Sequence, residues 1–205
     1  YGEAGIGKSR LLLEFRRHAE AAGARWVLGR CVSYGHSIAH LPVLDLLRDL
    51  FGIKEGDNVE TMLDKVEGGI REAGDDVAWT APFLRALFSL DPGDAAVEAM
   101  NPGQRNGRTA EAVRDLLLAH SGKHPLVLVV EDLHWIDPHS EDMLRLLLES
   151  MAADPVMVVL TYRPGYAQTF GEQTYIARIT LRALPEAQTV AMVQRVLQAD
   201  VPLEA

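Results

Sequence analysis

The sequence has 205 residues, 48% of them hydrophobic and 24% charged, which is the composition of a globular domain that can bury a full core. Its formal net charge of -9 argues against direct nucleic-acid binding by this segment, because such binding needs clustered lysine and arginine. No stretch is apolar for long enough to form a membrane helix, and the single cysteine, Cys31, cannot form an internal disulfide. We therefore expect a cytoplasmic protein with no membrane partner.

A glycine-rich loop opens the chain. Its sequence, GEAGIGKS over residues 2–9, satisfies the phosphate-loop pattern G-x-x-x-x-G-K-[ST] without a mismatch. The glycines let the backbone turn tightly and bring its N–H groups against phosphate oxygens. An amphipathic helix is predicted over residues 8–22, and its positive amino-terminal end points at the same anion. Loop and helix together predict a binding site for the phosphates of a nucleoside triphosphate.

Two side chains of this loop supply its chemistry. Lys8 provides a compact cation for the β and γ phosphates, and Ser9 provides a hydroxyl ligand for magnesium. No lysine lies in the N-K-x-D context with which GTPases recognise guanine, so adenine is favoured. We expect ATP and ADP as ligands and Mg²⁺ as the metal. The predicted nucleotide contacts are Gly2, Glu3, Ala4, Gly5, Ile6, Gly7, Lys8, Ser9 and Arg10.

The middle of the chain reads as a helical insertion over about residues 41–121. Its periodic segments are interrupted by three turn signals, Gly68-Gly69, Asp91-Pro92-Gly93 and Asn101-Pro102-Gly103. A short strand precedes the insertion, because the segment RWVLGRCV is apolar and partly β-branched. In chain order the pattern predicts that strand and then four helical segments: residues 25–32, 41–51, 59–70, 82–90 and 108–120.

A run of five apolar residues, LVLVV over 126–130, predicts a strand that is buried on both faces of a parallel sheet. The strand ends in Glu131 and Asp132, where a Walker B acid belongs. One such acid holds magnesium, usually through water, and its neighbour can polarise the attacking water. Adjacent strand residues point in opposite directions, so the two acids cannot share one role. We favour Glu131 for the metal and Asp132 for the water, and the reverse assignment stays open.

The next helix is expected to begin at Asp137 as its N-cap, with Pro138 at the first helical position. Two further strands are predicted over residues 156–161, again buried, and 176–181. Arg163 follows the first of them. An arginine at that position can reach the γ-phosphate and report its presence, and the alternative is a solvated arginine at the end of a strand.

Strands that alternate with helices predict an α/β fold. We expect a P-loop NTPase three-layer sandwich with a mostly parallel sheet, a helical insertion and the start of a helical lid. The ATPase core is assigned to residues 1–182, and the lid to residues 183–205, with a helix that begins at Pro185. A phosphate loop normally follows a buried strand and none precedes Tyr1, so we expect the chain to belong to a longer protein.

In this order, GEAGIGKS, LVLVVEDLHWID and VVLTYRPGY resemble the ATPase domain of bacterial signal-transduction NTPases, the STAND group, which is related to AAA+. The segment DLHWID is the most specific element of the resemblance. The segment GRCVSYGHSIAHLPVLDLLRDL also looks like the part that follows the P-loop helix in these proteins. The resemblance covers nearly the whole chain and implies an ASCE or AAA+-like fold. Its sheet order would place the strand before Thr161 between the P-loop and Walker B strands.

The resemblance also implies residue roles. Lys8 and Ser9 would contact phosphate and magnesium, Glu131 and Asp132 would form Walker B, and Arg163 would be the sensor. Such domains occur in large LuxR-type transcriptional regulators and beside class III adenylate or guanylate cyclase domains. The implied partners are the output and repeat domains of the same longer chain, and nucleotide-dependent self-association is left open.

We therefore predict a regulatory ATPase switch in which ATP binding and slow hydrolysis set the conformation. Two alternatives stay open. One is an AAA+ ATPase acting on DNA, which would need an arginine finger and a basic surface. The net charge of -9 disfavours the basic surface. The other is a nucleotide-binding scaffold that no longer hydrolyses ATP, because the order of Glu131 and Asp132 leaves the catalytic water unassigned.

Overall fold

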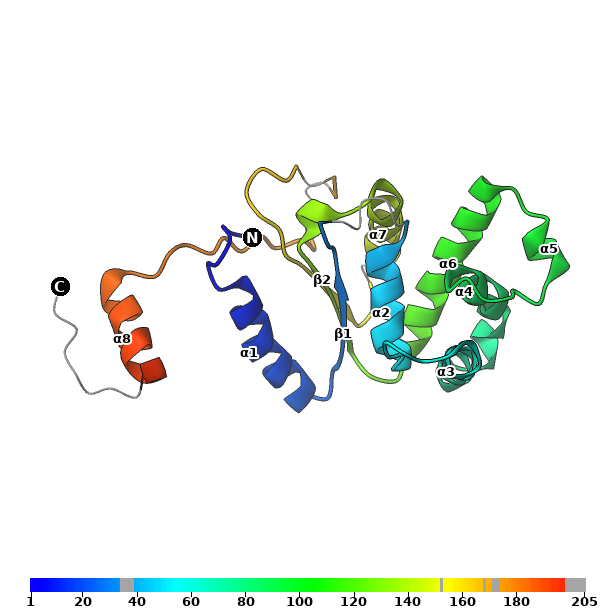
Figure 1. Cartoon of the computed structure of the whole chain (residues 1–205), viewed down its shortest axis with the longest axis horizontal. Coiled ribbons are helices and arrows are strands. Elements are labelled where there is room, and N and C mark those ends of the chain that lie inside the picture. Colours follow the sequence, from blue (N-terminus) through cyan, green and yellow to red (C-terminus); the bar gives the residue numbers. More distant parts are fainter. Residues whose placement is uncertain (34–38, 152, 168, 171–173, 198–205) are drawn as a thin grey trace.

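The computed structural model describes residues 1–33, 39–151, 153–167, 169–170 and 174–197. A parallel three-stranded sheet lies at its centre, with the order β1-β2-β3 (Figure 1). The register places Arg30 beside Glu131 at the carboxyl end of the sheet. All three strands therefore end at the edge where the predicted site residues follow. The strands are β1 (Arg25–Arg30), β2 (Leu126–Glu131) and β3 (Val156–Leu160).

Helices cover the two faces of this sheet and make the predicted three layers. On one face, α1 (Lys8–Ala21) packs Leu12 and Ala19 against alternate residues of β1 and β2. On the other face lie α2 (Leu41–Phe51) and α7 (Pro138–Ser150), as Figure 1 shows. Because β2 is the middle strand, its five apolar residues are buried on both faces, as its sequence predicts.

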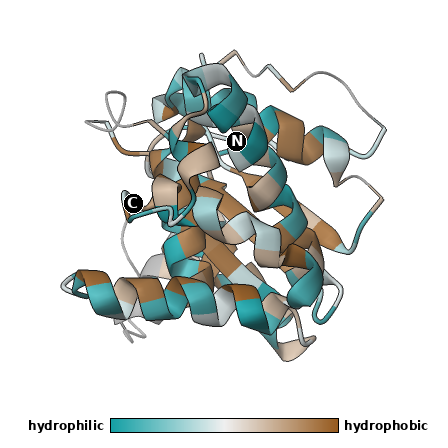
Figure 2. Cartoon of the chain, turned by 90° about the vertical axis from the view of Figure 1, so that its right-hand side faces the viewer, coloured by the Kyte–Doolittle hydropathy of each residue, from teal (hydrophilic) through white to brown (hydrophobic). Residues whose placement is uncertain are grey.

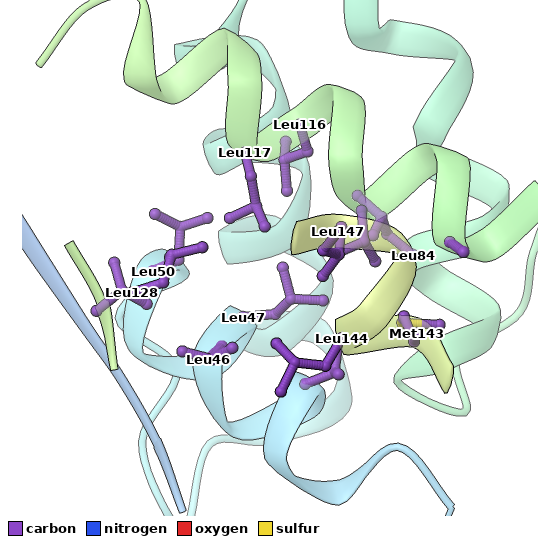
Figure 3. Packing of buried hydrophobic residues seen from close by; sticks show 14 of the residues in the cluster. Leu46, Leu47, Leu50, Leu84, Leu116, Leu117, Leu128, Met143, Leu144 and Leu147 are labelled. Atoms are coloured by element: carbon purple, nitrogen blue, oxygen red, sulfur yellow. The ribbon is translucent and has the colours of Figure 1, made fainter. Parts of the chain in front are cut away.

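The segment predicted as an insertion is helical, and the helices predicted over 59–70 and 82–90 are present. The break predicted at Gly68-Gly69 is wrong, because one helix continues through both glycines to Ala73. Its leucines form one core with those of α2 and α7 (Figure 3). The turn signal at Asn101 is the start of a helix, because the Asn101 side chain accepts a hydrogen bond from the Gln104 N–H at 3.0 Å. The helices are α3 (Val59–Ala73), the 3₁₀ helix η2 (Asp75–Thr80), α4 (Ala81–Leu87), α5 (Ala95–Glu98) and α6 (Pro102–Ser121).

Helix α2 lies directly against β1, the edge strand next to it. A side chain at Gly29 would meet the Pro42 carbonyl oxygen and the Leu46 side chain, so only glycine allows this approach. Two carboxylates of α2 accept hydrogen bonds from the outward N–H groups of β1. Asp49 pairs with Leu28 at 2.8 Å, and Asp45 with Arg30 at 3.2 Å. The helix therefore provides hydrogen-bond acceptors for N–H groups on the open edge of the sheet.

Two predicted features of the sheet are wrong. Strand β3 is only partly buried, with Met157 53% exposed, because β3 pairs with β2 on one side alone. Residues 176–181 do not form a strand. They do contact the start of the chain, since the Tyr1 amino group donates to the Ile179 carbonyl and the Leu181 N–H donates to the Tyr1 carbonyl. A single residue, Tyr1, provides too little backbone for a ladder of hydrogen bonds between strands.

The last described element is α8 (Glu186–Leu197), which begins directly after Pro185 as predicted. The rest of the predicted lid, residues 198–205, lies outside the described residues. The helices have both hydrophobic and hydrophilic residues along their surfaces (Figure 2), which is typical of helices that bury one face. Among the described residues no helix is long and apolar enough to cross a membrane.

Candidate functional site: a phosphate loop beside the Walker B acids

The glycine-rich loop has the tight backbone that its pattern predicts. Gly5 and Gly7 have φ angles of 73° and 101°, which only glycine adopts without strain. The loop leads directly into α1, whose first residue is Lys8. At the other end, the Gly2 N–H donates to the Tyr162 carbonyl at 3.2 Å. The loop therefore begins beside the end of β3, so this strand lies between the loop and β2, as the resemblance implies.

The Lys8 ammonium folds back over the loop. It donates to the backbone carbonyls of Gly2 and Glu3, each at 2.8 Å. An ammonium has three donor positions, so one remains for another acceptor, and phosphate oxygens could replace the two carbonyls. Arg10, a predicted nucleotide contact, instead forms an exposed ion pair with Glu14 one turn along α1 at 2.5 Å.

Ser9 and Glu131 are joined across the site. The Ser9 hydroxyl donates to Oε1 of Glu131 at 3.0 Å, although 122 positions separate them in the chain. A hydroxyl that donates a hydrogen bond keeps two lone pairs, and Mg²⁺ prefers hard oxygen ligands of this kind. The donor set therefore fits the predicted magnesium. Ser9 would bind the ion, and Glu131 would orient Ser9 and a metal-bound water.

Asp132 follows the last residue of β2 and lies in a turn. Its φ of 58° and ψ of 43° put it in the left-handed region, so a turn, not the alternation of a strand, separates the two acids. The buried Thr161 holds this turn. Its hydroxyl accepts from the Asp132 N–H at 3.1 Å, and its carbonyl accepts from the Leu133 N–H at 2.8 Å. A non-glycine residue in this conformation stores strain that is often found at functional sites.

His134 lies beside these groups and was not predicted as a site residue. Burial lowers its pKa below the ordinary value. The Asp132 carboxylate opposes this shift, whereas Arg163 and Lys8 lower the pKa further. Neither ring nitrogen makes a hydrogen bond within the described part of the chain. The charges of the loop lysine, the second acid and the predicted sensor therefore all act on this one imidazole. The one indication in the sequence was that His134 belongs to the DLHWID segment.

Arg163 is exposed and follows β3 at the same edge of the sheet. The loop that contains it is attached to α7. Within this loop, the Tyr166 N–H donates to the Arg163 carbonyl at 3.3 Å, and the Tyr166 hydroxyl donates to Glu141 at 2.6 Å. Glu141 belongs to the first turn of α7, whose predicted N-cap, Asp137, accepts from the Ser140 N–H at 2.9 Å. A movement of Arg163 would therefore reach α7.

Arg30 is the second residue that the motifs did not indicate. It ends β1, and its Nε lies 3.4 Å from Oε2 of Glu131, the oxygen that Ser9 does not contact. The sequence predicted Arg30 inside a strand over residues 25–32, and its partner becomes evident only from the strand register.

Comparisons with known proteins agree with this geometry. Residues 1–159 match the family model described as "AAA ATPase domain". The chain is also similar to an uncharacterized protein of Rhizobium meliloti (strain 1021), with 30% identity over 201 residues. The alignment covers 92% of this chain and 18% of that protein, so the chain spans less than a fifth of the length of this relative. No solved structure gives a significant match.

Proposed function

Because the chain belongs to the AAA ATPase domain family, we propose that it binds ATP with Mg²⁺ and hydrolyses it slowly, as the regulatory switch of a longer bacterial signal-transduction protein. The observation that carries this proposal is the contact between Ser9 and Glu131 at 3.0 Å. It brings the metal-binding end of the phosphate loop to the acid that ends β2. Output and repeat domains of the same protein are the proposed partners.

Binding begins at the loop. Lys8 exchanges its two carbonyl contacts, at Gly2 and Glu3, for oxygens of the β and γ phosphates. The loop N–H groups and the start of α1 face the same anion. Ser9 would direct a lone pair to magnesium while its hydroxyl stays hydrogen-bonded to Glu131. The metal, when bound, neutralises the charge that develops on the transferred phosphoryl group.

Hydrolysis and switching use the other side chains of the site. Asp132, which is about half exposed, accepts a proton from the attacking water. Arg163 pairs with the γ-phosphate and loses that partner after hydrolysis. Because Tyr166 joins the Arg163 loop to Glu141 at the start of α7, this loss repositions α7.

Calorimetric titration of the whole protein with ATP tests the proposal. Lys8→Ala should weaken binding by about 1.5 to 3 kcal/mol, the range of a hydrogen bond to a charged group. Lys54→Ala removes the same charge from an exposed loop and should leave the affinity unchanged. Equal ATP affinity in the parent and Lys8→Ala would contradict the assignment of the loop.

A further inference from the structure

One carboxylate at the site has two partners of different kinds. Oε1 of Glu131 accepts a hydrogen bond from the Ser9 hydroxyl at 3.0 Å, and Oε2 faces Arg30 Nε at 3.4 Å. The Glu131 side chain is only 15% exposed, so its negative charge is held close to both groups. Within the described part of the chain, Arg30 is the ion-pair partner of Glu131. Lys8 instead contacts loop carbonyls.

We infer that Arg30 is a positioning residue. Its guanidinium neutralises Glu131 when no metal is bound, and magnesium displaces the guanidinium from the carboxylate. The inference rests on the proposed function. A divalent cation held by Ser9 would lie within a few ångströms of the guanidinium, because both are next to the same carboxylate. Two cations at such distances repel each other, and the dication attracts the carboxylate more strongly than a single charge does. Magnesium binding therefore includes the loss of the Arg30 contact.

The structure allows Arg30 to leave without disturbing the fold. Its side chain is 60% exposed, so the guanidinium can move into solvent with little loss of buried surface. Its backbone stays in place, because the Arg30 N–H donates to Asp45 at 3.2 Å and the adjacent Cys31 N–H donates to the Glu131 carbonyl at 2.9 Å. Only the side chain changes partner. Arg30 consequently raises the magnesium concentration at which the ATP site fills.

The test follows binding of a fluorescent N-methylanthraniloyl ATP as Mg²⁺ is titrated into the protein. Arg30→Gln should lower the half-saturating Mg²⁺ concentration by about two- to fivefold, the range expected for a partly exposed ion pair. Arg30→Lys keeps a cation beside Glu131 and should stay near the parent. Arg145→Gln removes a comparable exposed pair, with Asp142 at 2.8 Å, far from the loop in sequence and should have no effect.

A double-mutant cycle separates this contact from a general loss of positive charge. In a Glu131→Gln background, Arg30→Gln should no longer change the Mg²⁺ dependence, because the partner is gone. An unchanged or raised half-saturating Mg²⁺ concentration in Arg30→Gln overturns the inference, and so does an equal effect in both backgrounds. A parent protein that binds no ATP at any Mg²⁺ concentration refutes the proposed function instead.

Discussion

The Ser9 hydroxyl donates a hydrogen bond to Oε1 of Glu131 at 3.0 Å. Ser9 is the second residue of α1, and Glu131 ends the middle strand, so the contact connects the phosphate loop to the sheet. The polar groups that would hold magnesium are thus already close together. A preorganised site of this kind requires little rearrangement when the nucleotide binds.

The two acids should differ in their effect on turnover and binding. Asp132→Asn should keep ATP bound and reduce hydrolysis by about 10²-fold or more, the usual contribution of a general base. Glu131→Gln should in addition weaken the dependence of binding on Mg²⁺, because Glu131 contacts Ser9. Single-turnover hydrolysis and ATP titration measure the two effects. If the parent hydrolyses ATP no faster than Asp132→Asn, the protein is a non-hydrolysing scaffold.

Arg163→Ala should remove the difference between the ATP-bound and ADP-bound states, because only the γ-phosphate distinguishes these nucleotides. Limited proteolysis with each nucleotide measures this difference, and cleavage near α7 is the expected site. Arg178→Ala, another arginine that follows β3, is the control. Identical ATP and ADP patterns in the parent would show that Arg163 is no sensor.

ATP should bind more tightly than GTP, because no lysine of the chain lies in the N-K-x-D context that reads guanine. Competition for a fluorescent ATP analogue measures the preference directly. Displacement by GTP at the same concentration as ATP would contradict the assignment of adenine.

Gly29→Ala should destabilise the fold by about 1–3 kcal/mol, the cost of overpacking a close contact. The added methyl would meet the Pro42 carbonyl oxygen and approach Leu46 Cγ to 2.8 Å. Gly68→Ala is a matched control within α3. No described atom lies within 4 Å of its added methyl, so it should stabilise the helix by about 0.5–1 kcal/mol. Urea unfolding of both variants gives the comparison, and equal stabilities would refute the close approach of α2.

Local patterns predicted the elements whose own residues contain enough information. The run over 126–130 is β2, and Asp137 caps α7, because these structures depend on a few neighbouring residues. The strand predicted over 176–181 is absent, since a strand requires a ladder of paired backbone, and among the described residues the backbone hydrogen bonds to this segment come from Tyr1. The prediction that β3 is buried was wrong for a related reason. The burial of a strand depends on what covers the side that does not pair with β2.

The sequence by itself determined the phosphate loop and the acids Glu131 and Asp132, because both are short motifs whose chemistry belongs to their residue types. Only the tertiary structure decided the partners across the chain: Ser9 with one oxygen of Glu131, and Arg30 with the other. It also placed Asp132 in a left-handed turn held by Thr161. Such pairings depend on strand order and register, which arise from packing of the whole core and not from any local pattern.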